Sequence, residues 1–310
     1  MPAPVWKPRI LVPASGPVAG VIWLTIAMAL LAGLPAFARA SMNAGLHSFE
    51  VVFLRNLLAT LMLSPLLFWR GTSLLKSRQL SLYGLRVAVS LFSMQAWFYA
   101  LALIPIGEVT AISFLAPVFG TLGAIFLLGE RVRLRRWTAI AVGFLGAMII
   151  LRPGVAPLGL GQACAIFNAM SVGLVVVMVK QLTAVDDPDK IVFLTNLMLA
   201  PLSLVPALFV WTWPSPEALI PVLGLGLTAV LGHIALVRGY AATDASLAMT
   251  FEFSRLPFTV AVAYLAFGET IDAWTWVGAA VIFGSAVYIT RREARLAAQR
   301  AIASSSRDQD

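Results

Sequence analysis

Two oppositely charged side chains lie inside one apolar run near the C-terminus, at Glu252 and Arg255. Residues three apart share one face of a helix, so these two can pair with each other or point together into a cavity. In a cavity they would suit a charged or zwitterionic substrate, whereas a self-satisfied ion pair would only fix helix packing. The sequence leaves both interpretations open.

A histidine, His233, lies well inside another apolar run, several residues from either end. Free imidazole titrates near pH 6.5, so this group could carry a coupling proton across the run (pKa about 6.5). The alternative is a neutral histidine hydrogen-bonded to a neighbouring helix. The chain has two histidines, one cysteine at Cys164 and no HExxH motif, so we expect no metal site, no cofactor and no intrachain disulfide.

Further polar and aromatic side chains could line a cavity. Gln95 and Tyr99 are four residues apart, and Trp97 lies between them, so the two rings could form an aromatic wall. Asn168 has Ser171 three residues later, and it could contact the substrate or form hydrogen bonds between helices. Helix packing alone would account for the aromatic residues equally well.

Two prolines and one arginine complete the candidates. Pro117 and Pro257 lie at nearly matching positions of two similar runs. Because proline removes a backbone donor and disturbs the preceding turn, both could be gating kinks, or they could be static bends. Arg55 lies deep in a further run and needs a partner that the sequence does not identify.

The elements that hold these residues are membrane spans. The chain has 310 residues, of which 60% are hydrophobic and 12% charged, with a mean hydropathy of +0.90. A soluble globular chain has roughly 45–50% apolar and about 25% charged residues, so polar residues are too few here to cover a soluble surface. The net charge of +8 resides mostly in short linkers, which indicates membrane orientation rather than nucleic-acid binding.

Ten apolar runs each approach the length of about 20 residues that a helix needs to cross a bilayer. We therefore predict an all-α integral membrane protein with ten spans. The predicted spans are 17–39, 49–69, 81–103, 109–128, 134–152, 159–181, 191–212, 217–239, 245–267 and 273–290.

The distribution of basic residues between the two sides of the membrane tests the predicted number of spans. With the N-terminus inside, seventeen Lys and Arg residues fall on the cytoplasmic side and only Arg39 and Arg152 on the outside. Arg55, Arg86 and Arg255 lie within runs. This bias predicts that both termini are cytoplasmic.

Two similar linkers indicate a duplication. Residues 129–137 and 268–276 both begin Gly-Glu and both carry a Trp seven residues after the Glu. The first linker has four arginines, whereas the second has one Asp and no base. Five spans are an odd number, so a second copy inserts upside down, and inverted repeats are typical of secondary transporters with a midplane site. The rival is a duplicated membrane scaffold without transport.

The chain resembles the EamA family of the drug/metabolite transporter superfamily over roughly residues 17–291. The resemblance is carried by Phe98–Leu101, Ala111–Pro117, Leu128–Arg131, Arg238–Ala241 and Phe267–Glu269. It implies a ten-helix carrier of small metabolites, without ATP, with a central cavity lined by both halves. The second copy departs from the pattern at Glu252 and Arg255, where the first has Ser113 and Ala116.

We accordingly divide the chain into a cytoplasmic tail (1–16), a first repeat of five spans (17–152), an inverted second repeat (159–291) and a basic cytoplasmic tail (292–310). These repeats are called the first and second half below.

The expected function is alternating-access transport of a small organic metabolite, first an amino acid or derivative, across the bacterial inner membrane. Export of drugs or hydrophobic compounds is the alternative, and an enzyme is not expected because GxSxG and HExxH are absent. The expected partners are the small-molecule substrate, the bilayer, and protons or a counter-substrate. No nucleic acid is expected, and a homodimer stays open.

Overall fold

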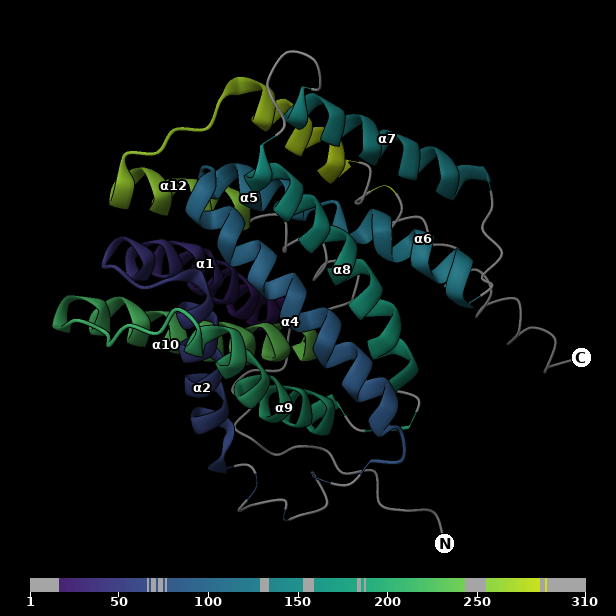
Figure 1. The fold of residues 1–310 in the computed structure, drawn as a ribbon. Helices are drawn as coiled ribbons and strands as arrows, with labels where there is room; N and C mark the ends of the chain where they lie inside the picture. The colour runs from purple at the N-terminus through teal and green to yellow at the C-terminus, as the bar shows by residue number, and fades with distance from the viewer. Residues whose placement is uncertain are drawn as a thin grey trace, which may run out of the picture.

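The structure is a computed structural model, and it describes residues 17–65, 67, 71, 75, 77–128, 134–152, 159–182, 185, 186, 188–242, 255–284 and 288. These residues form helices and contain no strand (Figure 1). The helices are α1 (Pro17–Asn43), α2 (Ser48–Leu63), α4 (Leu80–Leu103), α5 (Ile106–Ser113), α6 (Ala116–Leu128), α7 (Leu134–Leu151), α8 (Leu160–Leu182), α9 (Pro188–Leu208), α10 (Pro216–Ala242), α12 (Arg255–Phe267) and a last helix, Ala273–Gly284.

Five of the described helices are long and apolar enough to cross a membrane. They cover Gly20–Asn43, Leu80–Leu103, Leu160–Val179, Lys190–Leu208 and Pro216–Leu236. Shorter apolar helices include Arg255–Phe267 and Ala273–Gly284. A chain with this many apolar helices is an integral membrane protein, and the full count of ten spans stays a prediction.

The run predicted as one span at 109–128 is interrupted. Helix α5 ends at Ser113, and the amides of Phe114 and Leu115 donate three residues back, to Ala111 O at 3.2 Å and Ile112 O at 3.0 Å. Pro117 is the second residue of α6, where a helix needs no backbone donor. The proline therefore begins a new helix instead of bending a continuous one.

Pro257 occupies a similar place in the first turn of α12. Among the described helices, the prolines inside a helix are instead Pro35 in α1, Pro201 and Pro206 in α9, and Pro221 in α10. The two gating candidates are thus first-turn prolines, and whether either moves stays a prediction.

Helices of the two halves pack against each other in pairs. Helix α1 lies beside α10, α2 beside α9, and α4 beside α8 (Figure 1). Helix α12 also packs on α1, and α6 on α8. The described residues form three clusters of buried side chains, and each draws on both halves; the first includes Val51, Phe98 and Leu225. Each half therefore lacks an independent core along these helices.

Two close backbone approaches require glycine. A Cβ on Gly173 of α8 would lie 2.5 Å from the Gly120 nitrogen of α6. A Cβ on Gly278 of the last helix would lie 2.5 Å from the Gly146 oxygen of α7. Both contacts are closer than a side chain allows, so small residues let these helices meet at their backbones.

Candidate functional site

The polar contacts lie in three regions of the molecule. One region lies at each end of the α4–α8 pair, and the third lies between the helices. A Cβ on Gly161, at the start of α8, would meet Leu103 and Ile104 at the end of α4. Leu182, at the end of α8, packs with Tyr83 at the start of α4. The two helices are therefore antiparallel. We call the end near Ile104 the outer face and the end near Tyr83 the inner face, following the predicted orientation.

On the outer face, Glu269 joins three segments of the chain. Its Oε1 lies 2.5 Å from Nη1 of Arg39, near the end of α1. Its Oε2 accepts the backbone N–H of Ile106 at 2.8 Å, at the first residue of α5. Arg39 also donates to the Ile104 oxygen at 2.6 Å. A carboxylate at a helix N-terminus is favoured by the helix dipole, so Glu269 stabilises both the ion pair and the start of α5.

The same linker supplies a second ion pair, between Asp272 and Arg152 at the end of α7. Asp272 Oδ1 also accepts the Thr275 N–H at 2.8 Å. Burial raises the pKa of the Asp272 carboxyl, but the bonds from Thr275 and the charge of Arg152 outweigh it and hold that pKa below its usual range. Both arginines predicted on the outside are thus paired with acids of one linker.

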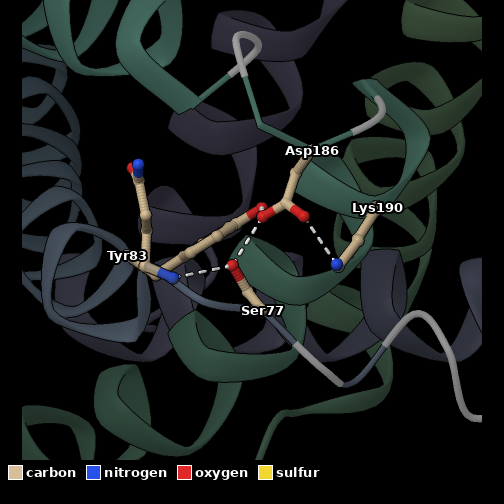
Figure 2. A network of polar contacts seen from close by, with 5 residues as sticks. Ser77, Tyr83, Asp186 and Lys190 are labelled. Carbon is tan, nitrogen blue, oxygen red and sulfur yellow. Dashed lines mark hydrogen bonds and ion pairs between the residues drawn. The ribbon is translucent and has the colours of Figure 1, made fainter.

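The inner face carries a network centred on Asp186, between α8 and α9 (Figure 2). Asp186 accepts hydrogen bonds from Ser77 Oγ at 2.5 Å, Tyr83 OH at 3.1 Å and Lys190 Nζ at 2.6 Å. Burial raises the pKa of Asp186, but these bonds and the Lys190 charge outweigh it and hold the pKa below its usual range. Ser77 and Tyr83 belong to the first half and Asp186 to the second, so the network fastens the halves together.

A surface hollow of about 390 Å³ adjoins this network, lined by Ser77, Arg78, Val185, Asp186 and Lys190. A larger hollow of about 560 Å³ lies among α4, α6 and α8 and is mostly apolar, with Phe92, Phe126 and Phe167 in its lining. Neither hollow contains a candidate residue from the sequence.

Within the bundle, Asn168 holds α8 to α4. Its Nδ2 donates to Ser93 Oγ at 2.9 Å and to the Ser93 backbone oxygen at 3.1 Å, and Asn168 is 7% exposed. Arg86 of α4 similarly donates to Thr195 Oγ1 of α9. These contacts satisfy polar groups between helices, which is the packing role that the sequence left open for Asn168.

Gln95 differs from these residues. Its amide oxygen and nitrogen are both buried, and neither has a hydrogen-bond partner in the part of the chain that the structure describes. A buried, unsatisfied polar group costs roughly 1–3 kcal/mol. Gln95 is therefore a buried polar group without a partner among the described residues.

Trp97 and Tyr99, the two aromatic candidates on α4, point to different sides of the helix. Two residues apart on a helix point about 200° apart, because each residue turns the helix by about 100°. Trp97 is partly buried against the core and meets Phe98 edge to face at 5.1 Å. Tyr99 is 36% exposed on another side.

The remaining ionisable candidates lie on α2, α10 and α12. Arg55 of α2 donates from Nη1 to Asn56 Oδ1 at 3.0 Å. His233 Nδ1 lies 2.6 Å from the Ala229 oxygen, and Arg255 is the first residue of α12. Glu252 lies outside the described residues. Sequence reasoning noted Arg55 only as an unpaired charge, and it did not single out Tyr83, Asp186 or Glu269 as functional groups.

Comparison with known proteins identifies the family. Residues 18–152 and 159–291 each match the model of the EamA-like transporter family. The chain belongs to this family. It is therefore a transporter and not an enzyme, as the sequence led us to expect.

Two transporters that are named for their cargo are similar over most of this chain. A riboflavin transporter of Vibrio cholerae is 31% identical, over 90% of this chain and 95% of that protein. An S-adenosylmethionine uptake transporter of Rickettsia felis is 28% identical, over 80% of this chain and 84% of that protein. A crystal structure shares the fold at 20% identity, with a TM-score of 0.62, and covers 89% of this chain and 98% of that one.

Proposed function

We propose that this protein is a secondary transporter that carries a small heteroaromatic metabolite across the bacterial inner membrane. Two inverted halves of five spans each would rock around a site between them. Both termini would be cytoplasmic, as the distribution of basic residues indicates.

The pairing of helices supports inverted halves. If the first helix of one half corresponds to the first of the other, exchanging the halves turns the α1–α10 contact into the α8–α4 contact. The same exchange turns α1–α12 into α8–α6 and leaves α2–α9 unchanged. All of these contacts occur, which is what a two-fold axis in the membrane plane requires.

The unsatisfied amide of Gln95 is the observation that carries the proposal. An amide presents a donor and an acceptor side by side, and many heteroaromatic rings offer the matching acceptor and donor on one edge. A ring bound there would satisfy both atoms at once. A site built to hydrogen-bond a ligand in this way also rejects molecules without the matching groups.

The relatives indicate which compounds to test first. Riboflavin and S-adenosylmethionine, named for the Vibrio and Rickettsia proteins, each contain a ring with such an edge. S-adenosylmethionine is also an amino-acid derivative, the class expected from the sequence. The mostly apolar hollow among α4, α6 and α8, lined by Phe92, Phe126 and Phe167, would suit a hydrophobic compound and is the observation that favours the alternative, drug export.

The test is transport of radiolabelled riboflavin and S-adenosylmethionine into proteoliposomes, with wild-type protein and Gln95→Ala. We expect the variant to lose at least tenfold in flux, because an unmet hydrogen bond in a dry site weakens binding by about this factor. Gln181→Ala is the matched control, since Gln181 is exposed in the last turn of α8. Equal flux in both variants would remove Gln95 from the site.

Coupling is measured in the same vesicles. A proton gradient or a loaded counter-substrate that accelerates uptake would define the driving force. Failure of the wild-type protein to move either compound, in either direction, would contradict the proposed function.

A further inference from the structure

Helices α2 and α9, one from each half, are joined by hydrogen bonds within the bundle. Asn56 Nδ2, in the middle of α2, donates to Ser203 Oγ at 3.2 Å, and both residues are 0% exposed. One turn further along α2, the Thr60 hydroxyl lies 2.9 Å from the Asn56 oxygen of its own helix and 3.2 Å from the Asn196 oxygen of α9. Separating the two helices would leave buried polar groups without partners, which is costly.

The same side of the molecule is also held at both faces. On the outer face, the Glu50 carboxylate at the start of α2 is 0% exposed and accepts the Thr212 N–H at 2.5 Å, just after α9 ends. On the inner face, Asp186, two residues before α9 begins, accepts the Ser77 hydroxyl at 2.5 Å, in the segment between α2 and α4 (Figure 2). A gate of a rocking transporter separates when its own face opens. Contacts that are formed at both faces at once indicate a side that opens to neither.

Exchanging the two halves turns one of these end contacts into the other. Glu50 comes directly after the first linker of its half, and Asp186 lies in the first linker of the other half. Ser77 and Thr212 lie in the second linker of each half. A carboxylate therefore meets a hydroxyl-bearing residue at both ends of α2–α9, the pair that the exchange leaves unchanged. A pair on the two-fold axis keeps its place when inverted halves exchange conformations, so it can serve as a pivot.

The outer ion pairs lie on the opposite side of the molecule. In Figure 1, α2 and α9 are at the bottom, whereas α5, α7 and α12 are at the top. Arg39 with Glu269, and Arg152 with Asp272, connect the halves near the outer ends of these upper helices. Their side chains are 15% and 18% exposed in the first pair and 35% and 38% in the second, so water reaches both. Ion pairs that water can solvate separate at a small net cost.

Helices α4 and α8 also join the two halves. They are connected near their midpoints, where Asn168 Nδ2 donates to Ser93 Oγ at 2.9 Å. A contact at one level allows the two helices to tilt against each other. It differs in this respect from the contacts of α2 and α9, which run from the outer face to the inner face.

We propose that the α2–α9 pair is the hinge about which the two halves rock, and that the two ion pairs of the Glu269–Asp272 linker are the outer gate. The gate is closed in the conformation described here and separates when the substrate site opens outwards. This inference rests on the proposed function. It assigns the fixed and the moving sides of the transport cycle.

Distances between spin labels test the hinge and the gate without a substrate. Leu103→Cys with Thr270→Cys places labels across the gate, and Leu61→Cys with Val192→Cys places them across the hinge, in a Cys164→Ser background. All four labelled positions are exposed. Pulsed electron paramagnetic resonance measures both distances in proteoliposomes.

The gate is then weakened by removing both of its acids, with Glu269→Gln and Asp272→Asn combined. We expect a new population at longer distance across the gate and no change across the hinge, because only the gate contacts are lost. Glu217→Gln is the control, since Glu217 is an exposed carboxylate in the first turn of α10 and takes no part in either ion pair. It should leave both distances unchanged.

Cross-linking tests the same assignment in transport. Thr60→Cys with Asn196→Cys forms a disulfide across the hinge, and Arg152→Cys with Asp272→Cys is joined across the gate by a short bifunctional thiosulfonate. We expect the cross-linked gate to lose its flux of riboflavin or S-adenosylmethionine and to regain it on reduction. The cross-linked hinge should keep the flux of its reduced form. Each double variant before cross-linking is its own control.

The failures are distinguishable. A hinge distance that changes as much as the gate distance, or a hinge disulfide that stops transport as completely as the gate cross-link, would overturn the hinge. A gate distance that does not respond to Glu269→Gln with Asp272→Asn, or a cross-linked gate that still transports, would overturn the gate. Absence of flux for both compounds in wild-type protein would contradict the proposed function, while the spin-label distances would still decide the hinge and the gate.

Discussion

Arg39 and Glu269, 230 residues apart in sequence, form an ion pair of 2.5 Å on the outer face. Their side chains are 15% and 18% exposed. The pair ties α1 to the linker after α12, and through the Ile106 amide it also ties α5. The Glu of the second Gly-Glu motif, which marked the repeat in the sequence, therefore connects these three segments on the outer face.

Replacing Glu269 should weaken these contacts and lower the stability of the protein. Glu269→Gln keeps the shape but removes the charge that Arg39 and the α5 N-terminus require, so we expect a loss of about 1–3 kcal/mol in the free energy of unfolding. Thermal unfolding in detergent measures it, with Thr270→Ala as an exposed neighbouring control. If Arg39→Gln with Glu269→Gln costs as much as the two single changes added together, the two residues are not coupled.

The Asp186 network predicts a pH dependence on the inner face. Although burial raises the pKa of Asp186, its three donors hold the folded value below the unfolded value of about 3.9. Its contribution to stability is therefore complete above about pH 4 and is lost as pH falls through the folded pKa. Asp186→Asn should be less stable than wild type at pH 7 by about 1–3 kcal/mol.

The difference between Asp186→Asn and wild type should shrink as the pH falls below about 4, because the wild-type carboxyl then becomes neutral as well. Unfolding measured between pH 3 and 7 tests this. Tyr83→Phe removes one donor and should show a smaller loss with the same trend. If the difference in stability stays constant between pH 3 and 7, ionisation of the Asp186 carboxyl is not its cause.

Because the backbones of α6 and α8 lie close together at Gly173, we predict that a larger residue at this position destabilises the protein. Gly173→Ala places a Cβ 2.5 Å from the Gly120 nitrogen, so the helices must move apart. We expect lower stability by about 1–3 kcal/mol, the cost typical of overpacking. Gly84→Ala in α4 is the control, because no atom lies within 4 Å of its Cβ, and it should be neutral or stabilising.

The orientation of the two faces can be tested with single cysteines in a Cys164→Ser background. Thr270 and Arg78 are exposed and lie on the outer and inner faces respectively. A membrane-impermeant maleimide should label Thr270→Cys in intact spheroplasts and Arg78→Cys only after permeabilisation. The reverse pattern would place the molecule upside down and contradict the positive-inside argument.

The sequence by itself determined the class of molecule and its family. Hydropathy and charge are sums over residues, so neither needs a partner to be known before a membrane protein can be recognised. The Gly-Glu linkers and their neighbours were sufficient to indicate an EamA transporter, which the family match confirmed. The same reasoning placed Asn168, Gln95 and His233 inside spans but left the role of each open.

Only the tertiary structure decided which of these residues are satisfied. Asn168 has a partner in Ser93, 75 residues away, whereas both amide atoms of Gln95 have none among the described residues. Arg39 and Glu269 belong to different halves, and only the packing of the helices brings their side chains within 2.5 Å of each other. Hydrogen bonding and charge pairing depend on distances of a few ångströms between helices, and these are fixed by packing and not by the order of residues along the chain.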